Sequence, residues 1–186
     1  MKTPNGRSEV EQLFGHPAAA SGDLSPAWEQ GNIQLVGPPA GWHLFYQDTN
    51  TIKPVSGIRM HRLLADSFHE VLTDVWNFAR LEVKKSVGFD KTTQFYDEAT
   101  RAWLHERRLD VHGGGFNFRK VTGGSGLSMH AYGIAIDWDP NHNPRKKPLT
   151  RTLPDWWYEI WAQHGWTDGR HFKTPDPMHV QFATGV

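Results

Sequence analysis

The chain has 186 residues, enough for one domain that buries roughly two-thirds of the surface of its unfolded form. Its 20 basic and 20 acidic residues balance, so the charge gives no support to a nucleic-acid or anionic-membrane partner. The sequence has no cysteine, which excludes disulfides, thiol catalysis and zinc sites built on cysteine.

Residues 1–57 are rich in Gly, Pro, Ser and Asn, with short apolar stretches at 33–36 and 42–46. We predict an irregular N-terminal wrap with one or two short strands, in the same domain as a catalytic core over 58–186. The beginning, MKTPNGRSEVEQLFG, lacks an apolar core of signal-peptide length. No run approaches the roughly 18 apolar residues of a membrane span. We therefore expect synthesis in the cytoplasm without an integral membrane segment.

Further along the chain, apolar residues recur at three- and four-residue spacing from Arg59 to about Lys85, which predicts a long amphipathic helix. Two more helices are expected over 96–108 and over 155–165, the second of them closed by Gly165.

Strands are expected over 111–120, in the latter half of 127–139 and in the tail, 176–182. The segment 140–151 is a polar loop, too rich in proline to be helical. The balance predicts an α+β fold, with helices packed on a small antiparallel sheet.

The stretch LSMHAYGIAIDWD, residues 127–139, contains Asp137 in its predicted strand. Side chains alternate between the two faces of a strand, so Asp137 lies on the same face as Ala135. A carboxylate among small apolar side chains is costly unless a positive group lies against it. Zinc accepts imidazole and carboxylate ligands, and catalytic sites use three protein ligands with an open position for water. We predict that His130, Asp137 and His179 bind one zinc ion. From spacing alone, a hydrogen-bonded core histidine beside a strand-end aspartate is the favoured interpretation.

Asp176 precedes His179 by three residues. A zinc hydrolase needs a carboxylate that takes the proton of the attacking water and returns it to the leaving amine. Asp176 is a candidate for that base, and the alternative is a turn residue in a PDP loop.

The motif S-x-H-x-x-G-x-A-x-D, followed by a late D-x-M-H, resembles the zinc peptidoglycan peptidases. This family comprises VanY-like D-alanyl-D-alanine carboxypeptidases, VanX-like dipeptidases and the L-alanyl-D-glutamate endopeptidases of phage lysins and bacteria. GGGFNFRK before the motif and HGW before the tail are similar to family features, so the resemblance covers about residues 111–182. It implies the fold of the D-Ala-D-Ala peptidases, which the hedgehog signalling domain shares.

By position, the resemblance implies that His130, Asp137 and His179 are metal ligands and that Asp176 is the catalytic base. An unperturbed aspartate is a weak base at neutral pH. We therefore expect the apolar residues that flank Asp176 in the sequence to desolvate it in part; these residues are Pro175, Pro177 and Met178.

The resemblance also assigns Arg119 to an arginine that holds the substrate carbonyl or carboxylate and the developing oxyanion. Ser128 corresponds to a serine near the site that bonds the substrate or only shapes the loop. Gln181 stands where many members of the family have an acid. Any support that this acid gives to a metal ligand therefore passes to Gln181 or is lost.

Other aromatic and imidazole side chains have less specific expectations. Core packing is expected for at least two of three tryptophans, with a glycan platform as the alternative; they are Trp156, Trp157 and Trp161. Structural or solvated roles are expected for four histidines, namely His112, His142, His164 and His171.

The leading interpretation is a monomeric zinc metallopeptidase that cleaves a stem-peptide amide bond of peptidoglycan. An endolysin-type L-alanyl-D-glutamate endopeptidase, released to act on the cell wall, agrees best with the lack of a signal peptide. A D-alanyl-D-alanine carboxypeptidase or dipeptidase is the first alternative. A zinc-bearing, wall-binding module without catalysis is the second.

Overall fold

The computed structural model describes residues 1–49 and 51–186, and its helices and strands form an α+β fold, as predicted. The helices are α1 (Arg7–Phe14), α2 (Pro26–Asn32), α3 (Ala65–Val87), α4 (Thr93–Glu106) and α5 (Asp155–Gln163), with short 3-10 turns η1 (Arg62–Leu64) and η2 (Met129–Tyr132). The strands are β1 (Ile33–Val36), β2 (Leu44–Gln47), β3 (Ile52–Val55), β4 (Ile58–His61), β5 (Val111–Gly114), β6 (Ala135–Trp138), β7 (Thr167–Gly169) and β8 (Asp176–Gln181).

The main sheet has six strands in the order β3-β2-β5-β6-β8-β7. Its strand pairs are antiparallel except for β2 and β5, which run parallel. A parallel pair requires a long crossover, and here β3, β4, α3 and α4 supply it between β2 and β5. Strands β1 and β4 form a separate two-stranded antiparallel sheet. The sheet is therefore antiparallel around β6 and β8, where the predicted ligands lie.

The N-terminal segment holds more regular structure than the irregular wrap we predicted, because it contains α1 and α2 as well as β1, β2 and β3. The apolar stretch 33–36 forms β1, and 42–46 overlaps β2. Buried side chains of this segment, among them Val10 and Phe14 on one face of α1, belong to the same hydrophobic core as α3 and α5. The buried side chains of this segment thus pack in one core with those of the later helices.

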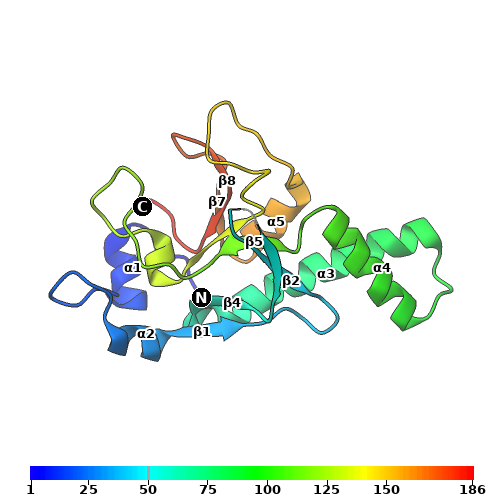
Figure 1. The fold of residues 1–186 in the computed structure, drawn as a ribbon, viewed down its shortest axis with the longest axis horizontal. Coiled ribbons are helices and arrows are strands. Elements are labelled where there is room, and N and C mark those ends of the chain that lie inside the picture. Colours follow the sequence, from blue (N-terminus) through cyan, green and yellow to red (C-terminus); the bar gives the residue numbers. More distant parts are fainter. Residues whose placement is uncertain (50) are drawn as a thin grey trace.

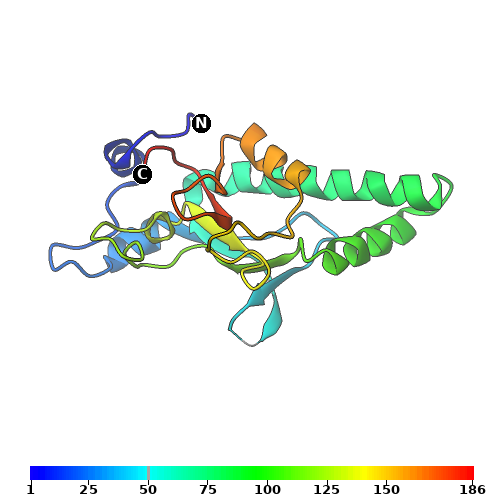
Figure 2. The same cartoon turned by 90° about the horizontal axis from the view of Figure 1, so that it is seen from above.

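The predicted long helix is α3, which forms an antiparallel pair with α4 that extends away from the sheet (Figures 1 and 2). Helix α5 packs across α3 and covers the sheet. Its Trp157 and Trp161 are buried, each 1% exposed, and their rings lie 5.8 and 5.9 Å from that of Trp138. Trp156 is half-buried and stacks on Phe78 at 4.1 Å. The expected core role of the tryptophans is therefore confirmed for Trp157 and Trp161.

Within the described residues, every helix is too short or too polar to cross a membrane.

Candidate metal centre

Two adjacent antiparallel strands carry two of the predicted ligands. Asp137 on β6 is paired in register with His179 on β8, so both side chains rise from the same place on the sheet. Cross-strand partners on one face have Cβ atoms about 5 Å apart, which brings the carboxylate and the imidazole together. The pairing of β6 with β8 is therefore what joins residues 42 positions apart in the sequence.

The third residue, His130, lies on the short turn η2 immediately before β6. Ser128 caps this turn, because its Oγ accepts a hydrogen bond from the backbone N–H of His130 at 3.3 Å. Gly133 ends the turn in the left-handed conformation, with φ +67°. A Cβ at Gly133 would lie 2.6 Å from Ile33 and 2.8 Å from the backbone nitrogen of His61. The serine and glycine of the motif thus shape the loop that directs His130 at Asp137.

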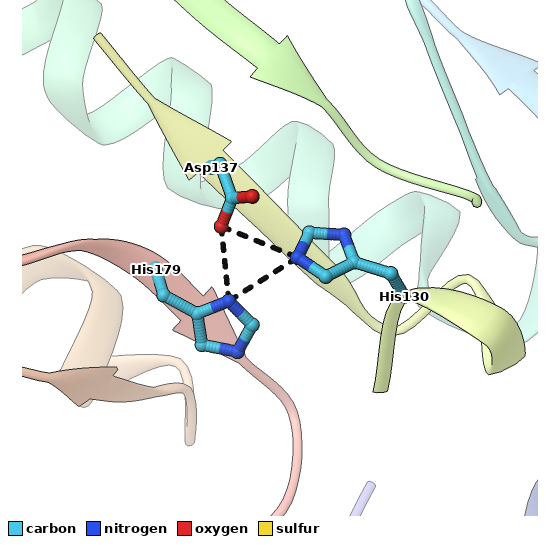
Figure 3. A group of neighbouring side chains, drawn as sticks. All are labelled: His130, Asp137 and His179. Atoms are coloured by element: carbon cyan, nitrogen blue, oxygen red, sulfur yellow. Dashed lines mark hydrogen bonds and ion pairs between the residues drawn. The ribbon is translucent and has the colours of Figure 1, made fainter. Parts of the chain in front are cut away.

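The three side chains point at one another from η2, β6 and β8 (Figure 3). His130 Nε2 lies 3.2 Å from Asp137 Oδ1 and 3.2 Å from His179 Nδ1, and His179 Nδ1 lies 3.0 Å from Asp137 Oδ1. In the described part of the chain, this is the one group of three or more such side chains close enough together to hold a metal ion.

The second nitrogen of each imidazole faces a hydrogen-bond acceptor. His130 Nδ1 lies 2.7 Å from the carbonyl oxygen of Gly115, and His179 Nε2 lies 3.0 Å from Oε1 of Gln181. These partners place the imidazole protons on the outer nitrogens, which leaves His130 Nε2 and His179 Nδ1 as lone pairs directed at Asp137.

Two lone pairs and a carboxylate oxygen converge without a donor between them, which is the arrangement that a divalent cation satisfies. Imidazole nitrogens and a carboxylate suit zinc, and histidine ligands almost always donate their other N–H to an acceptor. The donor set and the outer hydrogen bonds therefore fit a metal ion.

The electrostatics of the cluster agree with a centre that attracts positive charge. Burial alone would raise the pKa of Asp137, but His130 and His179 together bring it well below its ordinary range. Burial alone would lower the pKa of His179, but the Asp137 carboxylate outweighs burial and raises it. Asp137 and His179 thus favour each other's charged forms.

Asp176 begins β8 and lines the same cleft as Asp137 and His179. Its pKa is raised mainly by burial, while His179 and Arg145 oppose the rise. The direction and the cause are those that we predicted from its apolar sequence neighbours. One carboxylate oxygen, Oδ1, is buried without a hydrogen-bond partner, and the other lies 3.8 Å from Nε of Arg145. A carboxylate with a raised pKa beside the cluster is suited to proton transfer.

Two cavities adjoin the cluster, one of about 250 Å³ and one of about 230 Å³. Asp137 and Arg119 line both, so the two cavities meet at these residues. Ser128 lines the first cavity and is 6% exposed. Its hydrogen bond to His130 accounts for a loop-shaping role, while Arg119 is placed to reach a ligand in either cavity.

The other histidines have partners or surroundings of a structural kind. His142 contacts Asp139 at 3.0 Å, and His164 contacts Asp74 at 2.8 Å. His112 is buried, and its ring lies 5.8 Å from that of Tyr46 and 6.1 Å from that of Trp138. His171 is exposed.

Sequence patterns did not reveal several residues of the site. Gly115 supports His130 through its backbone, and Tyr46, Arg7 and Arg145 line the cavities. The glycine run at 113–115 was the available signal for a close backbone approach. Arg7 and Tyr46 lie far from the motif in the chain, and no spacing rule links them to it.

A sheet and an adjoining turn that together present two histidines, an aspartate and a desolvated carboxylate to a cleft suit a metal-dependent hydrolase. Residues 122–182, about a third of the chain, match the model of a family described as D-alanyl-D-alanine carboxypeptidase. The match confirms the resemblance to the zinc peptidoglycan peptidases, and it supports a metallopeptidase that acts on peptidoglycan. It contains the three cluster residues and Asp176, but not Arg119. Comparisons with curated proteins and with solved structures found no match.

Proposed function

We propose that this protein is a zinc-dependent L-alanyl-D-glutamate endopeptidase of the endolysin type, which cleaves the stem peptide of peptidoglycan. The observation that carries the proposal is the cluster of His130, Asp137 and His179, with Asp176 and Arg119 on the wall of the same cleft. These five side chains can supply the metal ligands, the general base and the oxyanion donor of metal-assisted amide hydrolysis.

In this mechanism His130, Asp137 and His179 hold the zinc ion. Zinc, when bound, supplies a water of lowered pKa and polarises the scissile carbonyl. Asp176 accepts a proton from the attacking water, because its carboxylate lacks a strong partner and its pKa is raised toward the working range. The same carboxyl group then protonates the leaving nitrogen. Arg119 donates hydrogen bonds to the carbonyl oxygen as that oxygen gains negative charge.

The two cavities support an endopeptidase. A peptide cut in its interior needs room on both sides of the scissile bond, and two adjoining cavities reach the cluster, one lined by His179 and the other by His130. A D-alanyl-D-alanine carboxypeptidase or dipeptidase is the second candidate, and the description of the matching family favours it. A wall-binding module would not need a desolvated carboxylate at Asp176.

We propose that the enzyme works as a monomer, since one chain supplies the ligands, the base and the arginine. We propose also that it acts at the cell wall after release from the cytoplasm, where its substrate lies. Residues 58–186 would form the catalytic core, with residues 1–57 packed onto it in the same domain.

Digestion of purified peptidoglycan, followed by mass spectrometry of the released ends, tests the proposal. New amino groups on D-glutamate that are lost with chelator and restored by zinc would establish the endopeptidase. Released D-alanine would establish the carboxypeptidase instead. Intact peptidoglycan in the presence of zinc-loaded protein would refute both enzymes and favour the binding module.

A further inference from the structure

The catalytic cleft gathers positive charge that the rest of the chain does not show. The chain as a whole is neutral, with 20 basic and 20 acidic residues. The larger cavity is nevertheless lined by three arginines, Arg7, Arg119 and Arg145, against two acidic side chains, and by Val186, the last residue of the sequence. Of these acids, Asp137 belongs to the metal cluster, and Asp176 is placed to transfer protons. An uneven charge distribution of this kind favours an anionic ligand.

Arg7 reaches the cleft from the N-terminal helix α1, 120 positions away from the residue that holds it. Its Nη1 donates a hydrogen bond of 2.8 Å to the carbonyl oxygen of Leu127. The guanidinium lies against Gly126, where an added Cβ would be 2.9 Å from Nη2 and 3.1 Å from Cζ. A glycine at 126 therefore makes the space that the Arg7 side chain occupies, immediately before the loop of Ser128 and His130.

The charge of Arg7 is not neutralised by a close ion pair. Among the residues that the structure describes, no carboxylate oxygen lies within 4.0 Å of its guanidinium nitrogens. Glu11, one turn further along α1, instead accepts a hydrogen bond from the Tyr132 hydroxyl at 3.0 Å. Arg145, by contrast, already faces Asp176 at 3.8 Å. Arg7 is thus a half-buried, fixed cation on the cleft wall, with N–H groups to spare.

We infer that Arg7 binds a free carboxylate of the substrate, distinct from the carbonyl that is attacked, and so selects anionic stem peptides. This inference rests on the proposed function. A guanidinium fork matches the planar carboxylate group and binds it more strongly than a neutral acceptor. Two carboxylates of a stem peptide have this chemistry, the α-carboxylate of D-glutamate and the carboxylate at the C-terminus.

Binding can be measured apart from cleavage. The probes are synthetic stem pentapeptides in three forms: both carboxylates free, the D-glutamate α-carboxyl amidated, and the C-terminus amidated. Each is titrated by calorimetry into zinc-loaded protein that carries Asp176→Asn, in which hydrolysis is expected to be slow. Hydrolysis of the same peptides is followed separately with protein that retains Asp176.

Arg7→Gln is the test variant, and Arg62→Gln is the matched control. Arg62 also donates one hydrogen bond to a backbone carbonyl, that of Gly31 at 3.0 Å, but it does not line the cavity. Arg7→Lys keeps the positive charge without the fork, and it replaces Arg7→Gln if thermal unfolding shows that Arg7→Gln does not fold.

The free peptide should bind about tenfold more tightly, or better, than one of its amidated forms. The form that loses affinity identifies the carboxylate. Arg7→Gln should abolish this difference, Arg7→Lys should reduce it, and Arg62→Gln should keep it. The inference would be overturned if Arg7→Gln preferred the free peptide over the amidated forms as strongly as the protein with Arg7 does. It would also be overturned if no variant distinguished these peptides, or if none of the peptides bound at all. Selective binding without hydrolysis would refute the proposed function and leave the role of Arg7 standing.

Discussion

His179 donates a hydrogen bond from Nε2 to Oε1 of Gln181 at 3.0 Å, and the Gln181 amide donates in turn to the carbonyl of Ala183 at 3.1 Å. Because the amide nitrogen is engaged by a carbonyl, the amide oxygen must face the imidazole. Gln181 thereby sets the tautomer of His179 and leaves Nδ1 free to bind a cation. Gln181 thus supports His179 at the position where the resemblance would place an acid.

Replacing Gln181 should weaken the metal site. We expect Gln181→Met to lower zinc affinity about tenfold or more, since lost support of a ligand commonly costs 10–100-fold. Zinc titration against a competing chelator measures the change. Gln163→Met, at an exposed position on α5, is the control and should leave the affinity unchanged. Equal affinities in the two variants would show that Gln181 does not support His179.

Removing the carboxylate of Asp176 should stop catalysis without releasing the metal. Asp176→Ala is expected to lower kcat by about 10²–10⁴-fold, the usual contribution of general acid–base catalysis. Metal analysis of the same preparation should still find one zinc ion per chain. Asp90→Asn, at a fully exposed carboxylate between α3 and α4, should be as active as the unchanged protein. Near-normal turnover in Asp176→Ala would exclude this residue as the base.

Zinc affinity should fall as the pH decreases. Protons compete with zinc for His130 and His179, and the pKa of His179 is raised by Asp137 in spite of burial. The competition therefore begins at a higher pH than burial alone would give and strengthens as the pH falls. Titrations at pH 8 and pH 5 should show weaker binding at pH 5. The same affinity at both values would exclude the two histidines as ligands.

The buried His112 should make the fold less stable in acid. Burial lowers its pKa from 6.5 to about 4, and neither ring nitrogen has a hydrogen-bond partner. Because the folded-state pKa lies below the unfolded one, stability is unaffected above pH 6.5 and falls as the pH drops toward 4. Between pH 7 and pH 5 the loss should be about 2 kcal/mol.

Denaturant unfolding of the zinc-free protein at pH 7 and pH 5 measures this loss. His112→Leu should show a smaller drop in the free energy of unfolding than the unchanged protein. His69→Leu, at an exposed position on α3, should keep the full drop. An identical drop in His112→Leu would assign the acid sensitivity to other groups.

The parts of the fold that depend on local periodicity were predicted well. Helix α3 extends from Ala65 to Val87, so its predicted end near Lys85 is close, but its predicted beginning at Arg59 is wrong because residues 59–61 belong to strand β4. Its spacing of apolar residues is long enough to distinguish a helix from a strand without tertiary information. The metal cluster was predicted from a motif, and the register of Asp137 with His179 supplies its physical reason.

The remaining features depend on contacts between distant segments. Helix α1 is short, and it is stabilised by burial of Val10 and Phe14 in the common core more than by its own propensity. The contact of Arg7 with Leu127 joins positions that no local pattern connects. The parallel pairing of β2 with β5 likewise arises only when the α3–α4 pair returns the chain to the sheet.

The most direct measurement is an anomalous difference map, recorded at the zinc edge, from a crystal of the zinc-loaded protein. The account predicts one peak that is bonded to Nε2 of His130, Nδ1 of His179 and the carboxylate of Asp137. The identity of these nitrogens follows from the hydrogen bonds to Gly115 and Gln181. No peak at this position, with the three side chains still in mutual contact, would contradict the account.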